Sequence, residues 1–176
     1  MSERVSKNSS QLLLGGLETT SHLLAHIMLF LAERPEMMET LRANPSLVPA
    51  FVEEMLRYES PIQALARIPT TDVTISGVTV PKGVLLLTLL GSANRDGSHF
   101  TDPDLFDLNR KQPSISFGHG IHFCLGAHLS RLEGRIGLEV LLNRFRGFSR
   151  PAGEITWNRA LTVRGPAALT LRFIPA

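Results

Sequence analysis

The chain has 176 residues, of which 43% are hydrophobic and 19% are charged, and its formal net charge is +2 at pH 7. That length suits one globular domain with a sizeable core, and the apolar share excludes an intrinsically disordered tail. The basic residues are scattered along the chain, so they indicate no nucleic-acid interface. The single cysteine, Cys124, excludes an intramolecular disulfide and any Cys₄ or Cys₂His₂ zinc site.

Residues 1–10 are polar and lack the apolar segment of a secretory signal, so we expect a polar leader there. The longest apolar stretch, residues 12–31, contains Glu18, His22 and His26, which make it too polar to cross a membrane unassisted. These features predict a cytoplasmic protein with a free thiol and no membrane span.

Residues 10–33 have apolar side chains near a 3.6-residue period, which predicts one long helix before Pro35. Shorter helices are expected from Pro35 through Arg42 and over residues 47–58. Short runs of β-branched residues over 62–90 predict small strands and hairpins, and residues 94–120 form a long loop of the kind that often carries function. Helical periodicity returns over 125–145, and residues 155–174 are strand-like. The fold class is therefore mainly α with a small β region (α+β).

The densest group of candidate functional residues is the loop over residues 117–126. Cys124 stands at the expected start of a helix, where free N–H groups and the helix dipole stabilise a thiolate. Gly118 and Gly126 let the backbone approach a large flat group, against which Phe117 can pack. A haem iron held by a proximal thiolate requires such an arrangement.

Other interpretations of these residues are available. A lone cysteine is commonly an inert buried side chain. His119, His122 and Cys124 could bind zinc, although they are crowded and lack a fourth ligand, and Cys124 could be a nucleophile with His122 as its base. His22 and His26 are four residues apart and could share a metal, but packed or solvated histidines are the more common case.

The pattern Phe117-Gly118-x-Gly-x-His122-x-Cys124-x-Gly126 resembles the cysteine-loop motif of the cytochrome P450 family. The resemblance implies that Cys124 is the axial ligand of the iron of haem b.

Two further segments agree with that resemblance, and the first is Gly15-Gly16-Leu17-Glu18-Thr19-Thr20. It is similar to the part of the family's central helix that crosses the distal face of the haem. The resemblance implies that Thr19 and Glu18 handle protons during dioxygen activation. From the residues alone, the Thr19 hydroxyl could instead bond to the carbonyl four residues earlier, with Glu18 on a solvated face.

The second segment, Glu54-x-x-Arg57, resembles the family's ExxR pair, which is buried and connects its helix to the loop before the cysteine. Many members have an arginine at the position of Leu105 as the third partner of this pair. The sequence therefore predicts an incomplete network unless Arg95 or His119 replaces that arginine.

The resemblance also implies that Arg67 and His122 hold the haem propionates, although Arg67 alone would pass for a surface residue of a strand. Residues 11–176 match the C-terminal, haem-binding part of the family fold, so we expect a truncated form without the N-terminal half. Positions that face a substrate would be Leu14, Gly15, Ile62 and Ala64.

The implied activity is monooxygenation of a small apolar substrate with dioxygen and electrons from a ferredoxin or similar donor. A complementary N-terminal chain is a further expected partner. The alternative is a catalytically inactive fragment that binds haem weakly or not at all.

Overall fold

The computed structural model describes residues 3–175, without the side chains of residues 3–8, 10 and 14. Its helices are α1 (Glu3–Glu33), α2 (Pro35–Ala43), α3 (Val48–Tyr58), α4 (Leu90–Ala93) and α5 (Ala127–Arg144), with short 3-10 turns η1 (Pro45–Leu47) and η2 (Gly120–His122). The strands are β1 (Leu65–Arg67), β2 (Val73–Ile75), β3 (Val78–Val80), β4 (Leu86–Thr88), β5 (Phe145–Ser149) and β6 (Arg172–Pro175). They pair antiparallel as β1 with β4, β2 with β3 and β5 with β6.

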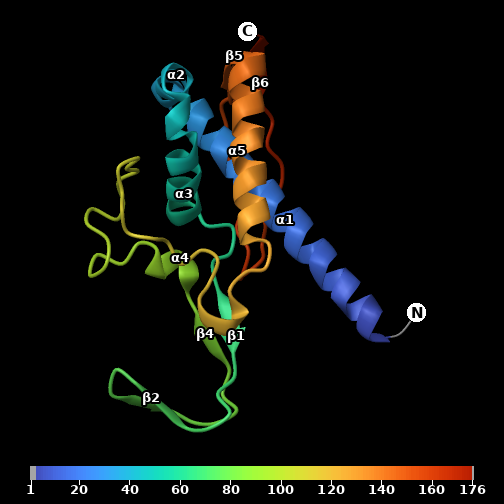
Figure 1. Ribbon diagram of the computed structural model, residues 1–176, viewed down its shortest axis with the longest axis vertical. Helices are drawn as coiled ribbons and strands as arrows, with labels where there is room; N and C mark the ends of the chain where they lie inside the picture. The colour runs from blue at the N-terminus through green and yellow to red at the C-terminus, as the bar shows by residue number, and fades with distance from the viewer. Residues whose placement is uncertain (1–2, 176) are drawn as a thin grey trace.

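The hydrophobic core lies where α3, α5 and the C-terminal half of α1 pack together (Figure 1). A Cβ atom on Gly134 of α5 would lie 3.1 Å from Val52 of α3 and 3.2 Å from Leu23 of α1. The missing side chain therefore lets α5 approach both neighbouring helices. The centre of this core is formed by fully buried apolar side chains: Leu23, Ile27, Leu41, Phe51, Met55 and Leu138.

Helix α1 begins at Glu3, earlier than the start near residue 10 that the sequence predicts. No proline or glycine occurs before Gly15 to stop the helix, so polar residues can continue it without apolar packing. Figure 1 shows that this end projects away from the core. Leu12, Leu13 and Leu17 on it are each 66% exposed.

By length and composition alone, the stretch Gln11–Glu33 of α1 is apolar enough to cross a membrane, which differs from the expectation based on its polar residues. The second half of this stretch packs into the core, with Leu23, Ile27 and Leu31 at most 1% exposed. A buried core helix passes the same test, so the finding is weak evidence for a membrane span.

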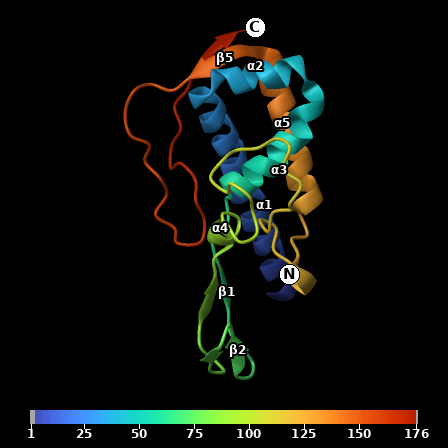
Figure 2. The same cartoon turned by 90° about the vertical axis from the view of Figure 1, so that its left-hand side faces the viewer.

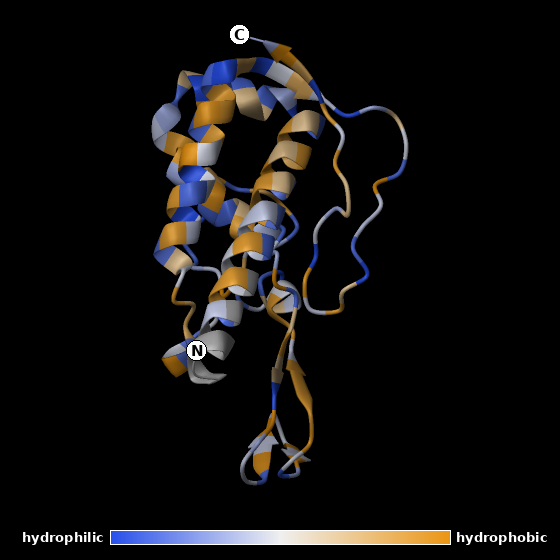
Figure 3. Cartoon of the chain, turned by 90° about the vertical axis from the view of Figure 1, so that its right-hand side faces the viewer, coloured by the Kyte–Doolittle hydropathy of each residue, from blue (hydrophilic) through white to orange (hydrophobic). Residues whose placement is uncertain are grey.

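The expected hairpins over residues 62–90 are confirmed and form an arm that extends from the helical body (Figure 2). Hydrophobic stretches run along the strands of this arm (Figure 3). Ile75 and Val78, at the far end, are 55% and 65% exposed. Strands with open edges and exposed apolar side chains are sites at which another chain can pair.

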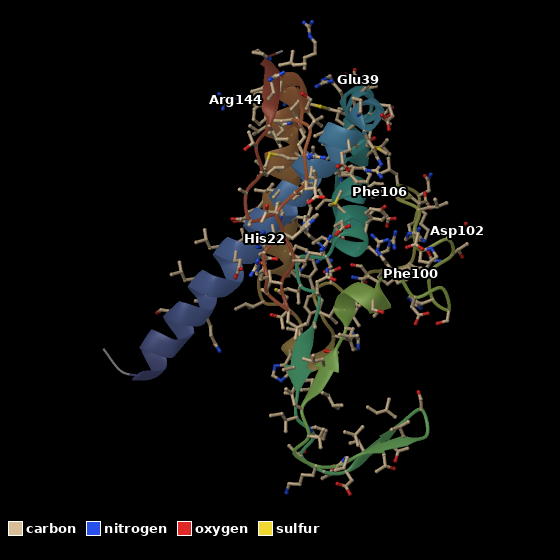
Figure 4. All side chains as sticks on the ribbon, turned by 180° about the vertical axis from the view of Figure 1, so that it is seen from behind. His22, Glu39, Phe100, Asp102, Phe106 and Arg144 are labelled. Carbon is tan, nitrogen blue, oxygen red and sulfur yellow. The ribbon has the colours of Figure 1, made fainter. Side chains whose placement is uncertain are left out.

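An aromatic side chain, Phe106, packs the middle of the long loop after α4 against the helices. The Phe106 ring centroid lies 4.3 Å from that of Phe30 and 5.2 Å from that of Phe51 (Figure 4). These tilted ring contacts hold the middle of a segment that otherwise has little regular structure.

The expected strands over residues 155–174 are wrong for most of that range. The segment is an irregular loop with isolated bridges between Trp157 and Pro166 and between Ile62 and Val163, and only β6 is a strand. Pro166 and the glycines at 153 and 165 interrupt a continuous ladder. Strand β5 was not predicted, because Phe145 continues the apolar period of α5 one residue past its end at Arg144.

His26 is a buried side chain where α1 meets Glu59 and the C-terminal loop. It is 2% exposed, and its Nδ1 atom lies 2.9 Å from the Glu59 carbonyl oxygen. Its ring centroid is 6.1 Å from that of Trp157. Within the described part of the chain its Nε2 atom has no hydrogen-bond partner, so a neutral ring that donates from Nδ1 fits this environment.

Acidification is expected to destabilise the fold through His26. Burial, partly offset by the bond to Glu59, lowers the pKa of His26 from 6.5 to about 4. The neutral His26 ring contributes its full stability to the fold at pH values above the unfolded-state pKa of about 6.5. As the pH falls from about 6.5 to about 4, the unfolding free energy decreases by about 3 kcal/mol. Urea unfolding of wild type and His26→Asn over this range measures it. The variant should lose this pH dependence while exposed His128→Asn keeps it, and equal slopes in all three chains would contradict the assignment.

Candidate functional site

A mainly apolar cavity of about 500 Å³ lies between the N-terminal half of α1 and the loop that carries the cysteine. Its volume falls within the roughly 300–1,000 Å³ of small-molecule sites. Of the predicted site residues, the cavity is lined by Gly15, Thr19, Ile62, Phe117, His122, Cys124 and Gly126. The structure therefore brings together two motifs that are about 100 residues apart in the sequence.

The cysteine loop reverses direction just before α5. The Cys124 N–H donates to the Phe117 carbonyl at 3.0 Å, and the Ala127 N–H donates to the Cys124 carbonyl at 3.3 Å. Gly118 and Gly120 both have φ of +73°, which other residues adopt only with strain. These bonds hold the exposed thiol of Cys124 in the cavity wall beside the N-terminus of α5. The dipole of α5 favours a negative charge there.

The opposite wall is a thinned face of α1. A Cβ atom built on Gly15 or Gly16 would meet nothing within 4 Å, so this wall leaves the space open. The Thr19 hydroxyl donates to the Gly15 carbonyl at 2.7 Å, which is the back-bonded alternative considered from the sequence. Its oxygen lone pairs remain available as acceptors on the cavity wall. The Glu18 carboxylate is 50% exposed and lies 3.7 Å from Nε2 of His22.

The Glu54–Arg57 pair is buried, as the resemblance implies. Arg57 donates from Nε and Nη2 to the two carboxylate oxygens of Glu54 at 2.9 and 2.7 Å. It also donates to the carbonyls of Asn94 at 2.9 Å, Pro103 at 2.7 Å and Leu105 at 2.9 Å. One guanidinium thus connects α3 to three points of the long loop.

The third partner of this pair is Arg110, which corrects the expectation of an incomplete network. Its Nε lies 3.1 and 3.2 Å from the two carboxylate oxygens of Glu54. Leu105 contributes its backbone carbonyl, which accepts from Arg57 and from Arg110 at 3.1 Å. The sequence interpretation missed Arg110 because it expected the arginine at one fixed position, whereas the loop turns back over residues 107–110 and brings in a later one.

The two substitutes considered from the sequence lie elsewhere. Arg95 donates to Asp104 at 2.9 Å and to the Tyr58 carbonyl at 2.7 Å. His119 is exposed on the cysteine loop. Neither contacts Glu54 among the hydrogen bonds of the described residues.

Asn94 and Ser116 connect the Glu54–Arg57 pair to the cysteine loop, and the sequence interpretation assigned neither of them a role. The Asn94 amide donates to the Ser116 hydroxyl at 2.8 Å, and its oxygen accepts from the Ile115 N–H at 2.8 Å. Ser116 in turn donates to the Leu56 carbonyl at 2.7 Å. Since Asn94 also presents its carbonyl to Arg57, the backbone before Phe117 is fixed to α3 through buried hydrogen bonds.

The remaining predicted residues lie outside the cavity wall. Within the described residues, the lining does not include Glu18, Ala64, Arg67 or Gly118. Arg67 is exposed on β1, and its Nη1 donates to the Ala66 carbonyl at 2.8 Å. The side chain of Leu14 is outside the described residues.

The residues present fit a haem better than they fit zinc. The cavity offers one exposed thiol, apolar walls and glycine backbone on two sides, which suit a flat, largely apolar group held by one axial sulfur. Among residues whose side chains are described, no group of three or more His, Cys, Asp or Glu side chains could hold a metal ion. The proposed zinc set of His119, His122 and Cys124 is therefore not formed.

The family model for cytochrome P450 matches residues 2–158. The chain belongs to the cytochrome P450 family. The biotin biosynthesis cytochrome P450 of Bacillus subtilis is 49% identical over 134 residues, which are 76% of this chain and 34% of that protein.

Solved P450 structures share the fold closely. CYP109Q5 from Chondromyces apiculatus superposes with a TM-score of 0.90 and 44% identity, covering 96% of this chain and 44% of that one. CYP109E1 from Bacillus megaterium, in complex with corticosterone, gives a TM-score of 0.91 and 38% identity, covering 97% and 46%. The chain thus spans between a third and a half of the length of these P450 relatives. The family implies haem iron with cysteine thiolate ligation.

Proposed function

We propose that this chain carries the haem site of a bacterial P450 monooxygenase that binds haem b through Cys124. The observation that carries the proposal is the position of the Cys124 thiol, exposed in the wall of an apolar cavity that faces Gly15, Gly16 and Thr19. When bound there, haem supplies dioxygen activation: one oxygen atom enters the substrate and the other leaves as water, with two electrons and two protons consumed.

The residues around the cavity would shape the cysteine loop, bind the cofactor carboxylates and transfer protons. Phe117 and Gly118 would shape the loop, and Gly126 lies beside the sulfur, where a Cβ would be 3.9 Å from Sγ, an ordinary van der Waals contact. His122 and Arg67 would hold the two carboxylates of the cofactor. Thr19 would accept or pass a proton within the cavity, and the exposed Glu18 carboxylate would exchange protons with solvent.

The substrate class is a small apolar molecule, placed against Gly15 and Ile62 of the cavity wall. The apolar lining of the cavity supports this class, and the related CYP109E1 was solved with corticosterone. Electrons would come from a ferredoxin or a similar donor, and the working location would be the cytoplasm.

A complementary N-terminal polypeptide is the partner that best explains the outer face of α5. This face carries a stripe of exposed apolar side chains at spacings of four residues: Leu132, Ile136 and Val140. The spacing suits a packed helix. More than half of each relative's length has no counterpart in this chain. The alternative, an inactive form with weak or no haem binding, applies if the cavity cannot close without that polypeptide.

A carbon monoxide difference spectrum tests the proposal. The purified chain is supplemented with haem and reduced with dithionite, and a strongly red-shifted Soret band is expected from a thiolate ligand. A band typical of a neutral ligand, or no retained haem, favours the inactive alternative for the chain alone. The same spectrum is then recorded with the N-terminal half of a close relative added as a separate chain.

A further inference from the structure

Arg131, in the second turn of α5, touches both α3 and the cysteine loop. Its Nε and Nη2 atoms donate to the two carboxylate oxygens of Glu53 on α3, the second at 3.2 Å. Its guanidinium carbon also lies 4.5 Å from the centre of the Phe117 ring. The carboxylate thus fixes the guanidinium on one side while the aromatic ring meets it on the other.

Phe117 is connected to Cys124 by a backbone hydrogen bond, and both residues line the same cavity. Its carbonyl accepts the Cys124 N–H at 3.0 Å, and its ring lies on the cavity wall, 6.5 Å from the Phe123 ring. A change in the position of Phe117 therefore moves the acceptor that holds the Cys124 backbone. The backbone before Phe117 is already fixed through Ser116, so the ring is the part that Arg131 controls.

The Arg131–Glu53 pair contributes little as a surface ion pair. The two side chains are 30% and 48% exposed, and pairs of this kind stabilise a fold only slightly. Its geometry is more specific than such a role requires, because two bonds orient one guanidinium over one ring.

We infer that Arg131 is a positioning residue for the thiolate: oriented by Glu53, it holds the Phe117 ring and, through the Phe117 carbonyl, the Cys124 backbone. The inference rests on the proposed function only in its consequence for a bound haem. The contact between Arg131 and the loop can be tested without any cofactor.

Hydrogen exchange of the Cys124 amide in the haem-free chain is the first test. Arg131→Met should speed this exchange roughly fivefold, because a cation–π contact at a partly exposed site is lost. Arg135→Met, at an exposed position on the same helix, should leave it unchanged. Equal exchange rates in wild type and Arg131→Met would overturn the inference.

A charge swap separates positioning from simple stabilisation. Glu53→Arg combined with Arg131→Glu restores an ion pair between α3 and α5 but places a carboxylate at the Phe117 ring. The swap should leave the unfolding free energy close to that of wild type while the exchange of the Cys124 amide stays fast. Recovery of slow exchange would show that only the ion pair matters and would overturn the inference.

A bound haem provides the second readout. Arg131→Met and Phe117→Leu should each lower the fraction of the red-shifted carbon monoxide band and shift the iron reduction potential, and the double variant should add nothing further. If haem binds with an unchanged spectrum, potential and exchange rate, the role of Arg131 fails while the proposed function stands. If no variant or wild-type chain holds haem but exchange responds to Arg131→Met, the proposed function fails and the role of Arg131 stands.

Discussion

Replacing Arg57 by methionine is expected to destabilise the fold by about 3–5 kcal/mol, the cost of breaking a buried ion pair from one side. The Arg57 side chain is 1% exposed and donates to both oxygens of Glu54 as well as to three loop carbonyls. Methionine fills much of the volume but removes the donor from the Asn94 and Pro103 carbonyls and leaves Glu54 with Arg110 as its remaining arginine. Since domains of this size are stable by only about 5–15 kcal/mol, the loss approaches the whole stability of the fold.

Urea unfolding followed by far-ultraviolet circular dichroism measures the effect. Arg135→Met is the matched control, because Arg135 is an exposed arginine of α5 and its replacement should change the unfolding free energy by less than about 0.5 kcal/mol. Arg110→Met should fall between the two, since Arg57 would still neutralise Glu54. A loss below 1 kcal/mol for Arg57→Met would show that the network of Glu54 does not stabilise the fold.

Replacing Cys124 by serine is expected to abolish the red-shifted carbon monoxide band while leaving the fold intact. The thiol is exposed, so exchange of sulfur for oxygen removes little packing, and the unfolding free energy should change by less than about 0.5 kcal/mol. A serine hydroxyl does not ionise near neutral pH and cannot replace the thiolate as an electron-donating ligand.

The spectrum and the unfolding curve together decide this prediction. His122→Gln is the control from the same loop: it keeps the thiol, so the red-shifted band should persist, with weaker haem retention. A red-shifted band that survives in Cys124→Ser would show that another group binds the iron. A variant that loses the band together with its unfolding transition would show a structural role for the cysteine.

Local patterns predicted the helices of this fold well, because apolar periodicity and proline positions are short-range signals. Pro35 ends α1 and begins α2, as expected from its missing N–H and its clash with the preceding turn. Patterns failed where tertiary contacts decide the outcome. The segment after β5 has strand-like composition, yet it packs as an irregular loop. Side-chain contacts hold it, such as the one between Arg164 and Trp157, in which the guanidinium carbon lies 3.8 Å from the centre of the ring.

In the candidate site, too, the residues in local motifs could be predicted, and the residues that depend on distant partners could not. Cys124, Phe117 and Thr19 could be predicted because each stands in a motif of fixed spacing, and the structure places all three on one cavity. Arg110, Asn94 and Arg131 could not, because each acts through a partner that is 20 or more residues away in the sequence. The contacts of Arg110 and Asn94 depend on where a loop without regular structure turns, and the contact of Arg131 with Glu53 depends on how α5 packs against α3.

The order of synthesis matters for this fold, because α5 covers a core that α1 and α3 begin. Roughly 70 residues separate the end of α3 from the start of α5, and ribosomes add about 5–20 residues per second. Gly134 and Leu138 of α5 are therefore synthesised roughly ten seconds after Leu23 and Val52, the side chains that they pack against. During that interval the apolar side chains of α1 and α3 that α5 later buries are exposed, and exposed apolar surface of this kind favours aggregation before the chain is complete.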